Sequence, residues 1–262
     1  MNPLLKVSNL SMDFGGLRAL DSLDMEIREG EVLAVIGPNG AGKTTLFNCV
    51  TGIYEPSGGD IFITPAGGIP EKINGLLPNI ITKKGIARTF QNIRLFPNMT
   101  VLENVMIGRH CRTHSRIIGA IFRGKSTNEE EKEVVGKSRE ILEKIGLSEY
   151  VNEFAKNLPY GAQRRLEIAR ALATGPFILL LDEPAAGMNP QETRELDDLI
   201  RAICDKEKIS ILLIEHDMKL VMSISDRIVV MDYGKKIAEG APDEVRNDPV
   251  VIKAYLGEEF AA

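Results

Sequence analysis

Three short runs of consecutive apolar residues constrain the fold of this chain more than any other feature. The runs are Val32–Ile36, Ile178–Leu181 and Ile211–Ile214. A strand that is apolar on consecutive residues is buried on both faces, as in a parallel sheet covered by helices. A helical pattern follows each run, over Gly42–Val50, Gln191–Lys206 and Met218–Ile224. This alternation predicts an α/β fold built on a mostly parallel sheet.

Further strands and a helical insertion complete the predicted layout. Strands are also expected at Leu4–Leu10, Leu23–Ile27, Ile61–Ile63 and Ile228–Met231. From about Met99 to Ala173 the sequence carries no strand pattern. One helix is expected there from an N-cap at Asn128 to Ile145, with Gly146 as its C-terminal cap, and another from Gly161 to Ala173.

The segment between the first buried run and its helix has the clearest chemical pattern, G-x-x-x-x-G-K-[ST]. Glycines let a loop turn its N–H groups inward around phosphates, and the helix N-terminus behind adds partial positive charge. In such loops the lysine reaches the β- and γ-phosphates and the hydroxyl binds Mg²⁺. The alternative, a glycine-rich turn without a ligand, would not need the flanking strand and helix. The candidate phosphate-binding residues are Gly37, Pro38, Asn39, Gly40, Ala41, Gly42, Lys43, Thr44 and Thr45.

Two carboxylates, Asp182 and Glu183, end the second buried run. Ligands of α/β folds bind at the carboxyl ends of parallel strands. We therefore expect Asp182 to hold Mg²⁺ through a water and Glu183 to act as the general base on an attacking water. Taken alone, the run would be better explained as a strand followed by a solvated acidic turn, but the upstream phosphate loop favours the catalytic interpretation.

The order of these motifs resembles that of the ATPases of the ABC (ATP-binding cassette) class. Asp182-Glu183-Pro184 resembles their second nucleotide motif, Gln91 their Q-loop glutamine and His216, just after a strand, their switch histidine. Phe14 lies upstream of the phosphate loop, where these proteins carry an aromatic that stacks on adenine. The resemblance covers nearly the whole chain.

Within the class, the sequence is most similar to the ATP-binding subunits of branched-chain amino-acid importers. The segments that carry this similarity are Ala87–Gln91, Leu166–Leu172, Asp182–Asn189, Leu213–Val221 and Ala254–Gly257. Two alternatives stay open: an importer subunit for another small solute, and an ABC ATPase that acts on nucleic acid or the ribosome.

The resemblance implies one ABC domain over residues 1–262. Residues 1–90 and 174–262 would form a P-loop NTPase core with an N-terminal antiparallel β subdomain, and residues 91–173 an inserted α-helical subdomain. It also implies ATP and Mg²⁺ as cofactors. Gln91 would sense Mg²⁺ and the attacking water, and His216 would contact the γ-phosphate.

The signature motif departs from the usual Leu-Ser-Gly-Gly-Gln. The aligned residues are Leu158, Pro159, Tyr160, Gly161 and Ala162. In the family each ATP lies between one subunit's phosphate loop and the other subunit's signature. Loss of the serine hydroxyl would weaken that contact, although Gly161 could still aim a backbone N–H at the phosphate. We therefore favour pairing with a different ATP-binding subunit over a homodimer. Asn189 also replaces a frequent aspartate.

Charge and hydropathy limit the partners. The formal net charge of −5 does not favour a non-specific nucleic-acid binder, and we expect no nucleic-acid partner. No apolar run approaches the ~20 residues of a membrane span. The resemblance therefore implies a peripheral protein at the cytoplasmic face of the inner membrane, bound to permease subunits and acting indirectly with a periplasmic binding protein. The basic stretch Lys83–Lys125 either faces the membrane and its proteins or is simply solvated.

Overall fold

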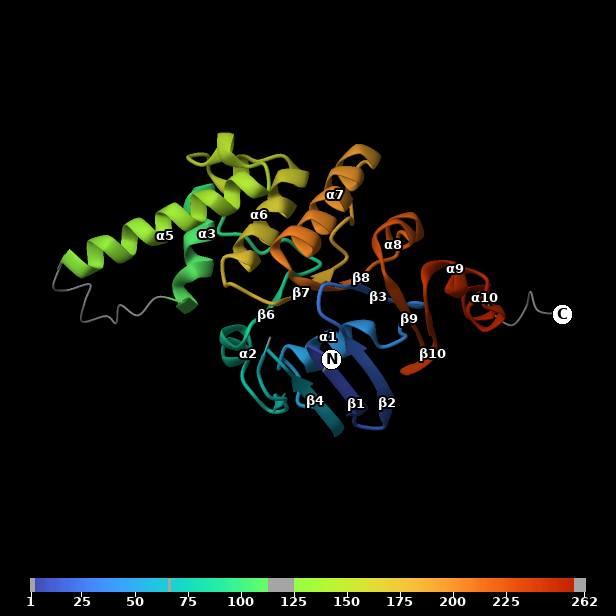
Figure 1. Ribbon diagram of the computed structural model, residues 1–262. Helices are drawn as coiled ribbons and strands as arrows, with labels where there is room; N and C mark the ends of the chain where they lie inside the picture. The colour runs from blue at the N-terminus through green and yellow to red at the C-terminus, as the bar shows by residue number, and fades with distance from the viewer. Residues whose placement is uncertain (1–2, 66, 113–124, 257–262) are drawn as a thin grey trace.

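The computed structural model describes residues 3–65, 67–112 and 125–256. Two sheets lie in successive layers, with the antiparallel sheet below the other in Figure 1. The antiparallel sheet has the order β2-β1-β4-β5. Its strands are β1 (Leu5–Phe14), β2 (Leu17–Ile27), β4 (Gly58–Ile63) and β5 (Glu71–Lys72).

The second sheet has the order β10-β9-β3-β8-β7-β6 and is parallel except for the β9–β10 pair. Its strands are β3 (Val32–Ile36), β6 (Ile86–Arg88), β7 (Ile178–Asp182), β8 (Ser210–Ile214), β9 (Arg227–Asp232) and β10 (Lys235–Gly240). Every residue of β3, β7 and β8 is buried, as the continuous apolar runs predict.

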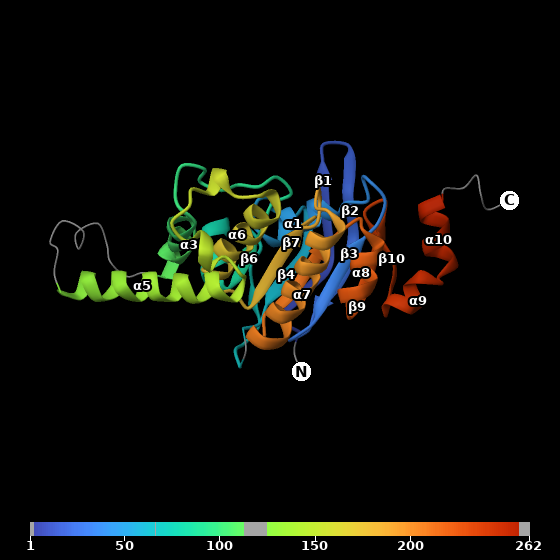
Figure 2. The ribbon, with the colours of Figure 1, turned by 90° about the horizontal axis from the view of Figure 1, so that it is seen from above.

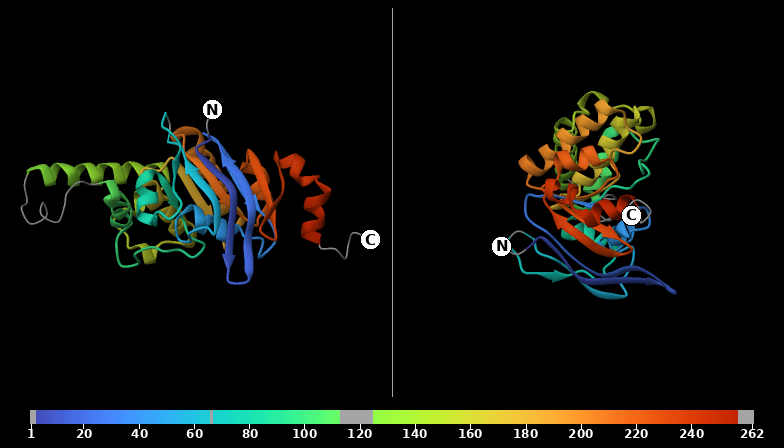
Figure 3. Two further views of the ribbon diagram at one scale, coloured as in Figure 1. Left: turned by 90° about the horizontal axis from the view of Figure 1, so that it is seen from below. Right: turned by 90° about the vertical axis from the view of Figure 1, so that its right-hand side faces the viewer.

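Helices cover both faces of the parallel sheet. The helices of this part are α1 (Lys43–Val50), α2 (Pro78–Lys84), α7 (Pro190–Glu207), α8 (Met218–Ile224), α9 (Pro242–Arg246) and α10 (Pro249–Leu256). On one face, Phe47 of α1 joins the apolar core between the two sheets. On the other, Leu196 of α7 and Leu220 of α8 join a second apolar core. Figure 3 shows β1 and β2 spread beneath the molecule, on the side away from α7.

The helical segment packs as a third layer around its own apolar cluster, which includes Val105, Leu142 and Leu166. Its helices are α3 (Val101–Arg109), α5 (Lys125–Lys144) and α6 (Tyr160–Leu172). Figure 2 shows α5 extending from one end of the molecule while α10 lies at the other. Among the residues described between α3 and α6, no strand occurs, in agreement with the sequence.

Some sequence expectations differ from the structure. Asn128 lies inside α5, which begins at Lys125, so its assignment as the N-cap was wrong. No residue of Lys125–Thr127 is a helix breaker, and the helix therefore extends upstream of Asn128. Part of the predicted basic stretch Lys83–Lys125, residues 113–124 with Arg116 and Arg123, lies outside the described residues. Within the described part, no helix is both long and apolar enough to cross a membrane.

Candidate active site

The phosphate loop connects β3 to α1 through glycines that a side chain could not replace. Gly37 has φ 152°, and a Cβ there would lie 2.1 Å from the backbone oxygen of Met231 in β9. Gly42 has φ 101° and caps the N-terminus of α1. The close approach of β9 and the left-handed backbone therefore explain why the loop needs glycine at these two positions.

Lys43 is buried and turned onto its own loop. Its Nζ donates to the backbone oxygens of Gly37, at 2.6 Å, and Pro38, at 2.9 Å. Burial lowers the pKa of Lys43, while the negative charges of Glu183 and Asp182 act in the opposite direction. The ammonium is thus within electrostatic reach of both carboxylates. Thr44, the next residue of α1, is exposed.

Asp182 ends β7 in a buried ion pair with Arg88 of β6. The Nη2 atom of Arg88 lies 2.7 Å from Oδ2 of Asp182. On its other side, Nη1 of Arg88 donates to Oδ1 of Asn48 in α1 at 2.7 Å. The guanidinium also lies over the rings of Phe47 and Phe90. Arg88 therefore links the helix after the phosphate loop to the acidic end of β7.

Glu183 is held on both carboxylate oxygens by the other two predicted catalytic residues. Gln91 Nε2 donates to Oε2 at 2.7 Å, and His216 Nε2 lies 2.8 Å from Oε1. The backbone of Glu183 has φ 48°, an uncommon conformation for a residue with a side chain. Three residues far apart in sequence thus meet at the carboxyl ends of β6, β7 and β8.

The Q-loop that carries Gln91 is fixed by two buried charged residues of α6. Arg164 donates to the backbone oxygens of Phe90, at 2.8 Å, and of Gln91. Glu167 pairs with Arg164 at 3.4 Å and accepts the backbone N–H of Arg94 at 3.3 Å. Burial raises the pKa of Glu167, whereas these partners act to lower it. Movement of α6 would therefore move the Q-loop with it.

The unusual signature residues make contacts within the chain. Tyr160 Oη donates to the backbone oxygen of Ala186 at 2.9 Å. Pro159 is the N-cap of α6 and supplies no side-chain hydrogen bond. Gly161 faces α7, where a Cβ would lie 2.7 Å from Oε1 of Glu192. Asn189 caps α7, since its Oδ1 accepts the backbone N–H groups of Gln191 and Glu192.

Phe14 lies at the tip of the antiparallel sheet, at the end of β1. The residue is 41% exposed, and its ring meets that of Tyr54 edge to face, with centroids 5.2 Å apart and planes at 78°. A half-exposed aromatic at this place retains a free face for stacking. Its role in adenine binding stays a prediction.

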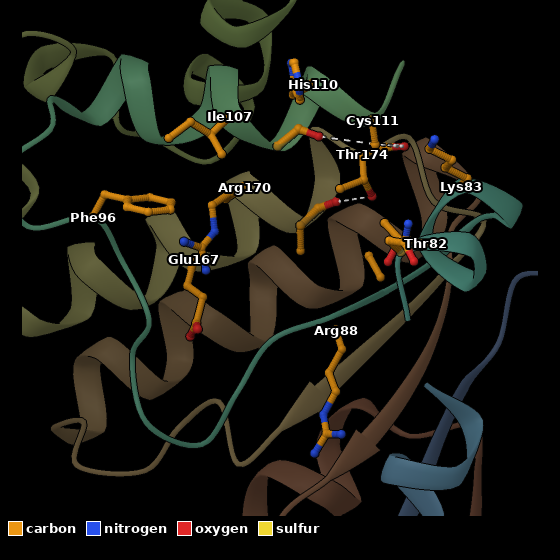
Figure 4. A pocket seen from close by; sticks show the side chains of 14 residues that line it. Thr82, Lys83, Arg88, Phe96, Ile107, His110, Cys111, Glu167, Arg170 and Thr174 are labelled. Atoms are coloured by element: carbon orange, nitrogen blue, oxygen red, sulfur yellow. Dashed lines mark hydrogen bonds between the residues drawn. The ribbon is translucent and has the colours of Figure 1, made fainter. Parts of the chain in front are cut away.

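A cavity of about 810 Å³ lies between α2, β6, α3 and α6. Figure 4 shows Phe96 and Arg170 on one side and Thr82 and Lys83 on the other, with Arg88 directed away from His110 and Cys111. The lining mixes exposed apolar groups, such as Phe96 and Ile107, with charged ones. One wall thus comes from the strand that carries Arg88.

The model of the ABC transporter family matches residues 20–186, which include the phosphate loop, Gln91 and Glu183. The chain belongs to this family. A second model, described as branched-chain amino acid ATP-binding cassette transporter, matches residues 235–261. As a member of the ABC ATPases, the chain is an ATP-binding and ATP-hydrolysing subunit of a transporter.

Relatives of this cassette match it over nearly its full length. The high-affinity branched-chain amino acid transport ATP-binding protein LivG of Salmonella typhimurium is 49% identical, with 98% of each chain covered. BraF of Pseudomonas aeruginosa, of the same description, is 48% identical with the same coverage.

Solved cassettes share the fold. The ADP conformation of an ATP-binding cassette of an ABC transporter superposes with a TM-score of 0.84 at 34% identity, covering 98% of this chain and 100% of that one. A dimeric bacterial ABC transporter cassette has a TM-score of 0.74 at 25% identity, with 91% and 98% covered.

Sequence reasoning did not find three residues of this ABC site: Arg88, Arg164 and Glu215. Each is a charged residue that the structure buries. Arg88 and Glu215 each directly follow apolar residues at the end of a strand, and a charged residue in that position could have indicated a site residue. Their partners, however, are distant in the chain, and only the fold brings them together.

Proposed function

We propose that this chain is the ATP-hydrolysing subunit of an importer for branched-chain amino acids, bound at the cytoplasmic face of the inner membrane. The observation that carries the proposal is the full-length similarity to LivG and BraF, proteins described as serving this transport. The match of residues 235–261 to the branched-chain amino acid model supports it at the C-terminus. A periplasmic binding protein would act indirectly, by delivering the amino acid to the permease.

The site residues fit a magnesium-bound triphosphate. Backbone N–H groups from Gly37 to Thr45 would surround the phosphates, with Lys43 at the β- and γ-phosphates. The Thr44 hydroxyl, the Gln91 amide and the Asp182 carboxylate are hard oxygen donors, the kind that Mg²⁺ prefers. Bound there, Mg²⁺ would neutralise charge on the phosphates.

Hydrolysis requires a base next to the attacking water, and the position of Glu183 beside Gln91 and His216 supports that role for it. Its carboxylate would accept a proton from the water as the water attacks the γ-phosphate. Gln91 and His216 hold the two oxygens of Glu183 and so restrict its orientation. Phe14 would stack on the adenine ring.

A different ATP-binding subunit is the dimer partner we favour. The phosphate loop of this chain keeps every residue of its motif, whereas Pro159 and Ala162 lack the side chains usual in the signature. The ATP held by this chain would be hydrolysed against the partner's signature, and the ATP held by the partner would meet the weaker one. Reconstituted with the permease alone, this chain should be defective in transport, and full transport by it alone would refute the heterodimer.

The permease is expected to dock in the cavity between α2, β6, α3 and α6. The cavity presents exposed Phe96 and Ile107 beside charged groups, a combination that suits an amphipathic protein segment. Phe96→Asp should reduce transport while the variant chain still binds ATP as the wild type does. Ile69→Asp is the matched control, since Ile69 is an exposed apolar residue that does not line this cavity. Equal transport by both variants would exclude docking there.

The decisive test of the substrate is transport in proteoliposomes that contain the permease and the second ATP-binding subunit purified with this chain, supplied with the periplasmic binding protein. We expect ATP-dependent uptake of leucine, isoleucine or valine and its loss in Lys43→Met. Uptake of ribose but of none of these amino acids would instead support an importer for another solute. Co-purification with RNA or DNA and without membrane subunits would contradict the proposal.

A further inference from the structure

Glu215 is a buried carboxylate that connects two loops of the active site. It stands between the last residue of β8 and His216, and it is only 4% exposed. Its Oε1 accepts the backbone N–H of Ala185 at 2.8 Å. Its Oε2 accepts the backbone N–H of His216 at 3.0 Å and that of Asp217 at 3.4 Å. One side chain thus joins the loop after β7 to the loop after β8.

The two loops carry Glu183 and His216, whose side chains contact each other. Ala185 lies two residues after Glu183 in the loop after β7, and His216 directly follows Glu215 in the loop after β8. The side chains of Glu183 and His216 meet at 2.8 Å. Glu183 has a positive φ, a conformation that persists only where the surrounding structure enforces it. The carboxylate of Glu215 supplies such a constraint, because it holds the backbone on both sides of the contact.

We propose that Glu215 is a positioning residue that sets the distance and orientation between Glu183 and His216. The inference rests on the proposed roles of those two residues. Glu215 acts through backbone N–H groups and is not required to touch nucleotide. Hydrogen bonds from N–H groups to an ionised carboxylate are about twice as strong as neutral ones, which suits a contact that must hold two loops.

Both the length and the charge of Glu215 are needed for this role. Glutamine has the same length, but its NH₂ group cannot accept, so one of the two loops loses its anchor. Aspartate keeps the charge but is shorter by one methylene and cannot span both loops. The two substitutions should therefore give similar defects, whereas a purely electrostatic effect on Glu183 would appear only with glutamine.

The kinetic test compares Glu215→Gln and Glu215→Asp with the wild-type chain. We expect kcat for ATP hydrolysis to fall about 100-fold, the scale of a small misplacement of a catalytic group, with KM for ATP within about threefold. Glu31→Gln is the matched control. Glu31 is a buried carboxylate like Glu215, and burial raises the pKa of Glu31. It precedes the N-terminal end of β3, however, whereas the phosphate loop follows the C-terminal end. That variant should lose stability and keep its kcat.

A second measurement reads the geometry directly and needs no hydrolysis. The chain has three histidines, so the imidazole ¹⁵N signals of His216 can be assigned by their loss in His216→Gln. In the wild type we expect the Nε2–H tautomer, because Nε2 faces a carboxylate oxygen. In Glu215→Gln the signals should move to the tautomer average of a free imidazole, and in Glu31→Gln they should not.

The outcomes separate the inference from the proposed function. If the wild-type chain hydrolyses ATP and Glu215→Gln keeps both its kcat and the His216 signals, the positioning role is refuted. If the wild-type chain does not hydrolyse ATP under any condition, the proposed function fails, while the ¹⁵N comparison still decides whether Glu215 sets the contact.

Discussion

Arg88 and Asp182 form a buried ion pair in which Nη2 and Oδ2 are 2.7 Å apart and the two side chains are 7% and 6% exposed. The same guanidinium reaches Asn48 of α1. One arginine therefore fixes the carboxylate at the end of β7 relative to the helix that follows the phosphate loop. Since Asp182 is the proposed Mg²⁺ residue, this pair connects protein stability with the nucleotide site.

Replacement of Arg88 by methionine should destabilise the chain by about 3–5 kcal/mol. The substitution keeps an apolar stem but leaves the Asp182 carboxylate buried without its counter-charge. Urea unfolding measures the loss, and the double variant Arg88→Met/Asp182→Asn should recover part of it. Arg94→Met is the control, because Arg94 also stacks on Phe90. Equal stability of Arg88→Met and Arg94→Met would show that the pair contributes little.

Gly37→Ala should damage nucleotide binding. A Cβ at Gly37 would lie 2.1 Å from the Met231 backbone oxygen, and φ is 152°. The strain of about 1–3 kcal/mol has to be relieved by moving the loop, which should weaken ATP binding at least tenfold as measured by equilibrium titration. Gly136→Ala, in the open interior of α5, should instead stabilise the chain by about 0.5–1 kcal/mol. Wild-type ATP affinity in Gly37→Ala would contradict the loop geometry.

The buried strands could be predicted from sequence because their environment leaves a simple pattern. Val32–Ile36 matches β3 in both bounds, since every residue there is buried. In contrast, β10 (Lys235–Gly240) contains no fully buried residue and β6 (Ile86–Arg88) has three residues, so neither gives a readable periodicity. Both are edge strands, which are held by one neighbour only.

The site could be predicted only as far as its motifs are local. Lys43 and Asp182 stand in continuous motifs. The structure brings Gln91, Glu183 and His216 into contact, and their catalytic roles stay predictions. Glu215 lies in the segment Leu213–Val221, but the sequence indicates no role for it, because its contact with Ala185 depends on how β7 and β8 pair. Long-range contacts of this kind follow from the fold and not from spacing.

Native thiols should differ sharply in reactivity. Burial raises the pKa of Cys49 and of Cys204 from 9.0 to about 11, whereas Cys111 is half-buried. Because the thiolate is the reactive form, a disulfide reagent at pH 8 should label Cys111 first and the other two only on unfolding. Fast labelling of all three thiols in the native chain would contradict this prediction.

The same raised pKa values set a direction for stability at alkaline pH. A group whose pKa is higher in the folded chain contributes stability that is present below its unfolded pKa and lost as the pH rises through the folded value. For these thiols the window runs from 9.0 to about 11. Cys49→Ala should therefore lose less unfolding free energy between pH 8 and 10 than the wild type does. An equal loss of unfolding free energy in the two chains would refute the raised pKa of the Cys49 thiol in the folded chain.

The most direct test of the central claim is single-turnover ATP hydrolysis by Glu183→Gln, with ATP affinity measured on the same sample. Glu183 is the group that Gln91 and His216 hold in place, and glutamine keeps its size but cannot take a proton. We predict ATP affinity within about threefold of the wild type and hydrolysis at least ~100-fold slower. Hydrolysis at the wild-type rate would contradict the assignment of Glu183 as the base.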